Sequence, residues 1–103
     1  MKMEKEVMIV KLPVGGYYLN RESDNSGDQG SMLRAIDDTG KQVGENGELH
    51  IGCSVQCGSH YARTMQWQDW WLTTPIIEFL EVSDENKFVK FKTKNSTYTL
   101  VVR

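Results

Sequence analysis

The sequence predicts an all-β fold, a small antiparallel barrel or sandwich of SH3-like size that ends in a three-stranded meander. Three observations predict it. Short apolar runs rich in β-branched and aromatic residues recur along the chain, Gly, Asn and Asp clusters separate them, and no segment has convincing helical periodicity. A length of 103 residues fits one domain. We therefore expect a single β domain over residues 1–103.

The N-terminal third predicts two strands and a long loop. Val7–Leu12 is a short apolar run stopped by Pro13, and a second strand can start at Tyr17–Leu19 after the turn at Gly15-Gly16. Residues 20–30 contain no apolar side chain. Because such a segment cannot anchor itself in a core, we expect it to be an exposed, mobile polar loop.

The middle of the chain predicts a hairpin followed by a longer strand. Met32–Ile36 is a strand candidate, and Gln42–Val43 can pair back to it across the polar turn at residues 37–40. Asn46-Gly47 signals a second turn. Residues 48–55 then alternate between polar and apolar, which predicts one half-buried strand. Its apolar face would carry Leu49, Ile51, Cys53 and Val55.

The C-terminal part contains the clearest strand pattern. Residues 64–72 predict a loop or a single helical turn that leads to Pro75, because nine residues are few for a stable helix. Three β-rich runs follow, joined by two short polar connections. The expected meander consists of Ile76–Val82, Phe88–Thr93 and Thr97–Val102.

The charge balance argues against non-specific DNA binding. The formal net charge is −2, so the chain has no overall electrostatic attraction to phosphate backbones. The segment 83–103 is nevertheless basic, with five basic and two acidic residues. An alternative function is therefore a single-stranded nucleic-acid or small-ligand binder that combines Trp stacking with a basic strand. Its basic residues would be Lys90, Lys92 and Lys94.

Composition also predicts the compartment. No signal-peptide pattern is visible, and no apolar run approaches the ~20 residues of a membrane span. We expect a cytoplasmic protein without a membrane partner. Its two cysteines then fit reduced thiols.

Three Trp residues within five positions form the most unusual segment. So many large rings are difficult to bury together, and Trp and Arg are enriched where proteins bind one another. Two interpretations follow: the Trp residues pack in the core, or they form a partner-binding surface, which is the candidate site that the sequence offers. The predicted surface comprises Arg63, Trp67, Asp69, Trp70 and Trp71.

Both cysteines and both histidines fall within eleven residues: His50, Cys53, Cys57 and His60. Two thiolates and two imidazoles can complete a zinc site, so a zinc-stabilised module is a further alternative. However, an extended chain would separate residues 53 and 57 by ~13 Å. That separation also exceeds the ~4.4–6.8 Å between the Cα atoms of a disulfide. No cofactor is expected, and no catalytic motif accompanies the thiols.

The C-terminal third resembles the ends of short uncharacterised phage and bacterial proteins. The shared pattern is a closing hairpin of the form Phe/Val-x-Thr-x-Asn-Ser-x-Tyr-x-Leu, here residues 91–100, preceded by Thr73-Thr74-Pro75-Ile76-Ile77-Glu78. The resemblance implies a small β fold and a phage or mobile-element origin. It implies no activity.

These observations together predict a non-enzymatic protein-binding module. One specific form is an inhibitor of a host-defence system, because such inhibitors are often small and acidic. A homodimer is a further expectation if an edge strand is left unpaired.

Overall fold

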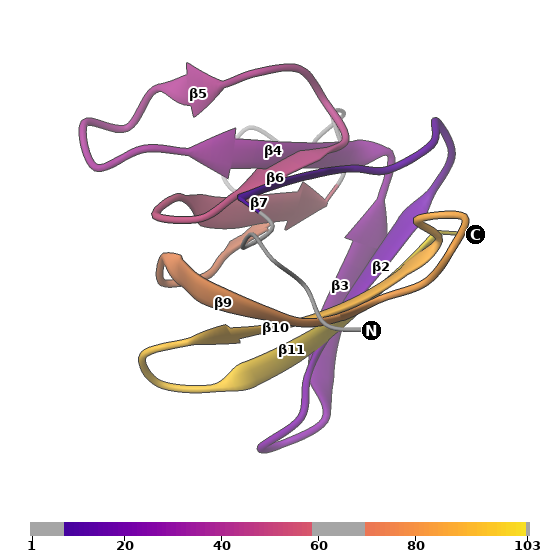
Figure 1. The fold of residues 1–103 in the computed structure, drawn as a ribbon. Helices are drawn as coiled ribbons and strands as arrows, with labels where there is room; N and C mark the ends of the chain where they lie inside the picture. Colours follow the sequence, from indigo (N-terminus) through magenta and orange to yellow (C-terminus); the bar gives the residue numbers. More distant parts are fainter. Residues whose placement is uncertain (1–7, 59–69, 103) are drawn as a thin grey trace, which may run out of the picture.

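The computed structural model describes residues 8–58 and 70–102, and it confirms the all-β prediction. Over these residues the chain forms eleven strands and no helix, and the strands pair into three antiparallel sheets (Figure 1). The pairing does not join the sheets into one continuous closed barrel. In this part of the chain there is consequently no helix with the length and apolar character needed to cross a bilayer.

The five-stranded sheet has the order β3-β2-β11-β10-β9. Its strands are β2 (Tyr17–Arg21), β3 (Ser26–Gly30), β9 (Ile76–Val82), β10 (Phe88–Thr93) and β11 (Thr97–Val102). The four-stranded sheet has the order β5-β4-β7-β8. Its strands are β4 (Met32–Ile36), β5 (Gln42–Val43), β7 (Ser54–Gly58) and β8 (Trp70–Leu72). The third sheet pairs β1 (Ile9–Lys11) with β6 (Glu48–His50).

The hydrophobic core lies between the sheets. The chain passes from β3 in the large sheet to β4 in the second sheet through a single residue, Ser31, so the two sheets are covalently joined at one corner (Figure 1). Inward-facing apolar side chains from these two sheets fill the space between them, which is the usual way for stacked sheets to bury one face each, and the small β1–β6 sheet adds Leu49. The fully buried members include Leu19, Leu33, Leu49, Val55, Ile76, Val89, Phe91 and Leu100.

The predicted meander and the predicted β4–β5 hairpin are both confirmed. Strands β9, β10 and β11 have the predicted bounds, and β5 pairs back onto β4. The connecting turn is held by Asp37, whose Oδ1 accepts hydrogen bonds from the Thr39 and Lys41 amides at 2.9 and 3.0 Å. Gly40 completes the turn at a φ of 88°, a conformation that glycine adopts without a Cβ clash.

The predicted loop at residues 20–30 is wrong in its second half. Strand β2 extends to Arg21, and Ser26–Gly30 forms β3, which pairs with β2 over five residues. Strand β3 has no apolar side chains of its own, and backbone hydrogen bonds to β2 hold it in place. Gly27 is required there, because a Cβ at this position would meet the Leu19 carbonyl oxygen and lie 3.1 Å from the Tyr18 ring.

The strand predicted over residues 48–55 is also wrong. Strand β6 ends at His50, the chain turns through Gly52 at a φ of 90°, and β7 begins at Ser54. The apolar alternation survives this turn, since Leu49, Cys53 and Val55 are all buried. A second correction concerns residues 64–72, where a loop or helical turn was predicted. Residues 64–69 lie outside the described residues, and Trp70–Leu72 form strand β8.

Asn46 ties the 44–47 turn to the neighbouring strand. Its Oδ1 accepts a hydrogen bond from the Leu33 amide at 2.9 Å, and its Nδ2 donates to the Ser31 carbonyl at 3.1 Å. The next amide, that of Gly47, donates to the Leu33 carbonyl at 2.7 Å. The predicted Asn-Gly turn is therefore present, with its side chain bound to the start of β4.

Candidate functional site

A row of cross-strand neighbours crosses the inner face of the large sheet and ends in an arginine. Phe79, Phe91, Tyr98 and Arg21 are direct partners on β9, β10, β11 and β2. Direct partners in antiparallel strands point to the same face. The apolar row therefore places the Arg21 side chain at the margin of the core, on the same side of the sheet as Phe91 and Tyr98.

Trp71 of β8 meets this row from the second sheet. Its ring packs edge-on against Tyr98, with centroids 6.1 Å apart and planes at 72°, and Tyr98 stacks on Phe91 at 5.3 Å. The Arg21 guanidinium carbon lies 4.9 Å from the Trp71 ring centroid, within the range of a cation–π contact. Trp71 is half-buried, so one cation and one indole come together where the two sheets meet.

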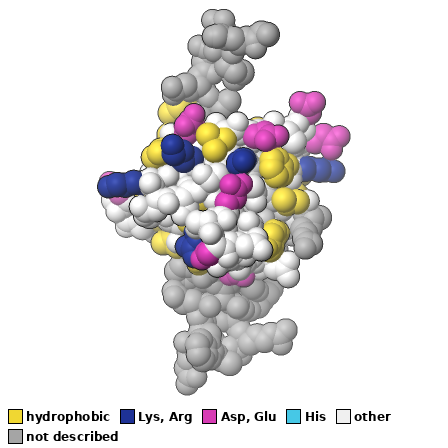
Figure 2. All heavy atoms as spheres, turned by 90° about the horizontal axis from the view of Figure 1, so that it is seen from below, with side chains coloured by type: hydrophobic (Ala, Val, Ile, Leu, Met, Phe, Trp, Pro, Cys, Tyr) yellow, Lys and Arg dark blue, Asp and Glu magenta, His cyan; other side chains and the backbone are white. Residues whose placement is uncertain are grey.

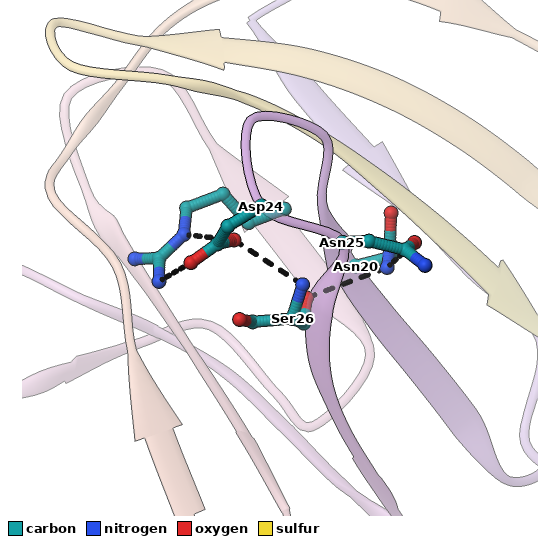
Figure 3. Close-up of polar contacts among 5 residues, drawn as sticks. Asn20, Asp24, Asn25 and Ser26 are labelled. Atoms are coloured by element: carbon teal, nitrogen blue, oxygen red, sulfur yellow. Dashed lines mark hydrogen bonds and ion pairs between the residues drawn. The ribbon is translucent and has the colours of Figure 1, made fainter.

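A carboxylate fixes the Arg21 head group. Asp24 accepts two hydrogen bonds from it, at 3.0 Å from Nε and 2.8 Å from Nη2. The Asp24 Oδ1 also accepts the Ser26 amide at 3.2 Å (Figure 3). The paired guanidinium lowers the pKa of Asp24 well below its usual value. Arg21 is thus held on the Trp71 ring by a partner three residues away in the β2–β3 turn.

The same turn is stabilised on its other side by two asparagines. The Asn20 amide Nδ2 donates to Asn25 Oδ1 at 3.0 Å (Figure 3). Asn25 adopts a φ of 58°, which Asn tolerates better than most residues. This fixed turn presents Asp24 toward Arg21 rather than leaving it on a mobile loop.

Only part of the predicted partner-binding surface can be placed. Arg63, Trp67 and Asp69 lie outside the described residues, and Trp70 is placed in the backbone of β8. Core packing and surface exposure were the two expectations for the Trp residues, and Trp71 combines them. It packs on the core, and its partly exposed ring also contacts Arg21. Sequence reasoning missed Arg21 and Asp24, which it placed in a loop. An i, i+3 Arg–Asp pair around a turn was the one available signal.

A second exposed surface lies on β9, and the sequence analysis missed it as well. The burial of this strand repeats every three residues: Ile76, Phe79 and Val82 turn inward or partly inward, and the pairs between them are exposed. The register with β10 shifts twice, which inserts Leu80 and Ile77 as extra residues. These are β-bulges. Ile77 and Leu80 are 53% and 44% exposed. In the sequence Ile-Ile-Glu-Phe-Leu-Glu-Val, two apolar residues and one Glu recur every three positions, and this departure from strict alternation could have indicated the exposed pair.

The three lysines of the nucleic-acid alternative do not form an uncompensated basic strip. Lys90 and Lys92 lie directly opposite Glu81 and Glu78 of β9, and the Lys90 Nζ is 3.4 Å from Glu22. Lys94 follows β10 and is exposed. In the view from below, on the side of the meander, hydrophobic side chains lie among charges of both signs (Figure 2). This mixture gives no field that would favour a polyanion.

The described members of the predicted zinc set do not converge. The His50 Nε2 lies 2.9 Å from the Glu48 Oε1, in a pair that is largely covered. Cys57 lies within the extended β7, with its sulfur 3.9 Å from the Asp28 carbonyl oxygen, and Cys53 precedes the strand. His60 lies outside the described residues. Over the described ranges, no group of three or more His, Cys, Asp or Glu residues is arranged around one point.

Both thiols are free and buried. Burial raises the pKa of the Cys57 thiol to about 12, and it raises the pKa of Cys53 as well. Because the thiolate is the reactive form, neither sulfur is a good nucleophile at neutral pH. The geometry therefore gives no support to thiol-based chemistry at these two residues.

No protein-family model, curated protein or solved structure matches this chain. The arguments for function below consequently rest on the residues themselves.

Proposed function

We propose that this chain is a non-enzymatic, protein-binding module whose contact surface is centred on the Arg21–Trp71 stack. The observation that carries the proposal is the cation–π contact itself, at 4.9 Å, between an indole and a guanidinium from different sheets. Trp and Arg are the side chains that most often dominate protein interfaces. A guanidinium already fixed by Asp24 also loses less freedom on binding than a mobile one.

An exposed apolar residue lies beside this stack in the chain. Leu72, the residue after Trp71, is 46% exposed at the end of β8. Among the described residues, β8 is an edge strand of the four-stranded sheet and pairs with β7 alone. A partner that covered Leu72 would bury apolar area next to the charged pair, which is the usual combination of apolar centre and polar rim at an interface.

The test compares three variants in affinity purification followed by quantitative mass spectrometry. Arg21→Glu reverses the charge over the indole, and Leu72→Asp places a charge at the exposed apolar position without touching the ion pair. Arg34→Glu is the matched control, since Arg34 is a half-buried arginine on β4. We expect a partner that is captured by the wild type and Arg34→Glu and lost by the other two. Equal capture by all four proteins would contradict the proposal.

A narrower form of the proposal is inhibition of a host-defence system by a phage- or mobile-element-encoded protein. It is supported by the acidic charge, by the small size and by the resemblance of residues 91–100 to the ends of short uncharacterised phage and bacterial proteins. Phage plating on a host that carries a defence nuclease, with and without expression of this chain, tests it. We expect plating to rise with the wild type and not with Leu72→Asp; unchanged plating would contradict the narrower form.

A further inference from the structure

The outer face of β9 and β10 carries two parallel rows of opposite charge. Glu78 and Glu81 form the row on β9, and Lys92 and Lys90 form the row on β10. Each Glu lies directly opposite one Lys, so the two rows have the same spacing along the strands. The strip formed by these four residues has no net charge and does not repel a copy of itself.

The two β9 bulges add an apolar residue beside each Glu. The inserted Ile77 precedes Glu78 and the inserted Leu80 precedes Glu81, and all four side chains are exposed. The strip therefore repeats one unit twice: an apolar side chain and a carboxylate on β9, with an ammonium opposite on β10. A bulged edge strand is a poor template for adding another strand by backbone hydrogen bonds. Any contact at this strip must therefore be made by side chains across the face.

This arrangement is self-complementary under one symmetry operation. Consider a two-fold axis that is parallel to the strands and lies above the line midway between β9 and β10. It places the β9 row of one copy over the β10 row of the other, and it leaves the position of every residue along the strand direction unchanged. It places Glu78 opposite Lys92 of a second copy and Glu81 opposite Lys90 of that copy. An axis across the strands would instead place carboxylate on carboxylate. Closed two-fold contacts of this kind are the commonest route to homodimers.

We propose that this strip mediates weak self-association, with the β9–β10 face of one chain packed on the same face of a second copy. The inference does not depend on the proposed function, because Lys90 and Lys92 alternate with Phe91 along β10 and therefore face away from the Arg21–Trp71 side. A contact two strands wide is smaller than the roughly 1,200–2,000 Å² of stable complexes. The dissociation constant is accordingly in the micromolar range or weaker.

Sedimentation equilibrium across a concentration series tests the proposal with charge-reversed partners. One variant carries Glu78→Lys and Glu81→Lys, and the other carries Lys90→Glu and Lys92→Glu. We expect the wild type to dimerise and each variant alone to remain monomeric, because like charges then face one another. An equimolar mixture of the two variants should form a heterodimer, and higher salt should weaken every dimer. A monomeric wild type up to millimolar concentration, or a mixture that remains monomeric, would overturn the proposal.

A neutral variant separates self-association from any effect of charge on folding. Lys90 also contacts Glu22, so reversing its charge alters the sheet itself. Ile77→Ser with Leu80→Ser removes the exposed apolar side chains and leaves every charge in place. Val14→Ser, at a 99% exposed residue between β1 and β2, is the control. We expect the dissociation constant to rise at least about tenfold in the first variant and not in the control. Equal values in both would count against the strip.

Discussion

Strands β9 and β11 both pair with β10, but they differ in how regular that pairing is. β11 lies between β10 and β2, and its five pairs with each run without interruption. Over residues 8–58 and 70–102, β9 has β10 as its single partner in this sheet, and it accommodates two bulges within seven residues. A strand held on both sides has its register fixed twice. An edge strand can insert residues and turn them outward, so the edge is where this fold has room for exposed apolar side chains.

The largest difference between the two strands is expected when one residue is deleted from each of them. Deletion of Thr99 would shift Leu100 or Tyr98 from the inner to the outer face, and we expect no cooperatively folded protein. Deletion of Leu80 removes a bulge residue and leaves Glu81 opposite Lys90 and Phe79 opposite Phe91. We expect that variant to fold. Far-UV circular dichroism with urea unfolding distinguishes them, and an unfolded Leu80 deletion would contradict the bulge assignment.

A smaller effect is expected from truncating one leucine on each strand. Leu100 is fully buried, so Leu100→Ala should lower the free energy of unfolding by about 2–5 kcal/mol. Leu80 is 44% exposed, and Leu80→Ala should cost less than about 1 kcal/mol. Urea denaturation of both variants at neutral pH gives the two values. Similar losses in the two variants would mean that β9 packs as an interior strand does.

The smallest expected effects are at two turns, β2–β3 and β4–β5, each of which joins an interior strand to an edge strand of its sheet. Hydrogen bonds hold the pKa of Asp24 and of Asp37 below the ordinary value in the folded state, from Arg21 in the first case and from Thr39 in the second. The unfolded chain therefore takes up protons first, and the stability from these carboxylates is lost as the pH falls below about 4. In Asp24→Asn and Asp37→Asn, we expect a flatter dependence of the urea midpoint between pH 5 and pH 3.

That prediction concerns exposed groups, so the wild type and variants should differ modestly at neutral pH. Asp37→Asn retains the Oδ1 that accepts from Thr39 and Lys41, which makes it the cleaner of the two. A midpoint with the same pH dependence in all three proteins would show that neither carboxylate is held in solution as it is in the structure.

Strands with clear apolar patterns were predictable from the sequence, and strands defined by pairing were not. Residues 76–102 contain alternation or dense β-branched residues, and short polar connections fix their pairing. Ser26–Gly30 has no apolar residue, and its strand exists because β2 offers a backbone partner. The turn at Gly52 could not be predicted from the apolar pattern, because the alternation of buried residues continues unchanged on both sides of it.

Of the two parts of the candidate site, the region of Trp71 was predictable from the sequence and Arg21 was not. Three tryptophans within five positions identify the region of Trp71 from the sequence alone. Arg21 precedes Trp71 by fifty positions, and no local pattern in the sequence indicates that the end of β2 lies against a ring of β8 in the other sheet. The charge rows behave similarly: the lysines of β10 are visible as a basic strand, but only the register shows that Glu78 and Glu81 lie opposite them.

The hydrogen bonds of Asn46 bear on how this protein ages chemically. An Asn-Gly sequence deamidates when the glycine amide nitrogen attacks the asparagine side-chain carbonyl carbon and closes a five-membered imide. Here that amide nitrogen is hydrogen-bonded to Leu33, and both atoms of the side-chain amide are bound as well. Deamidation at Asn46 therefore requires the turn to open first. Deamidation raises the mass of the protein by about one unit. The rate at which this mass increase appears at Asn46 therefore measures how often the loop that joins β5 to β6 opens.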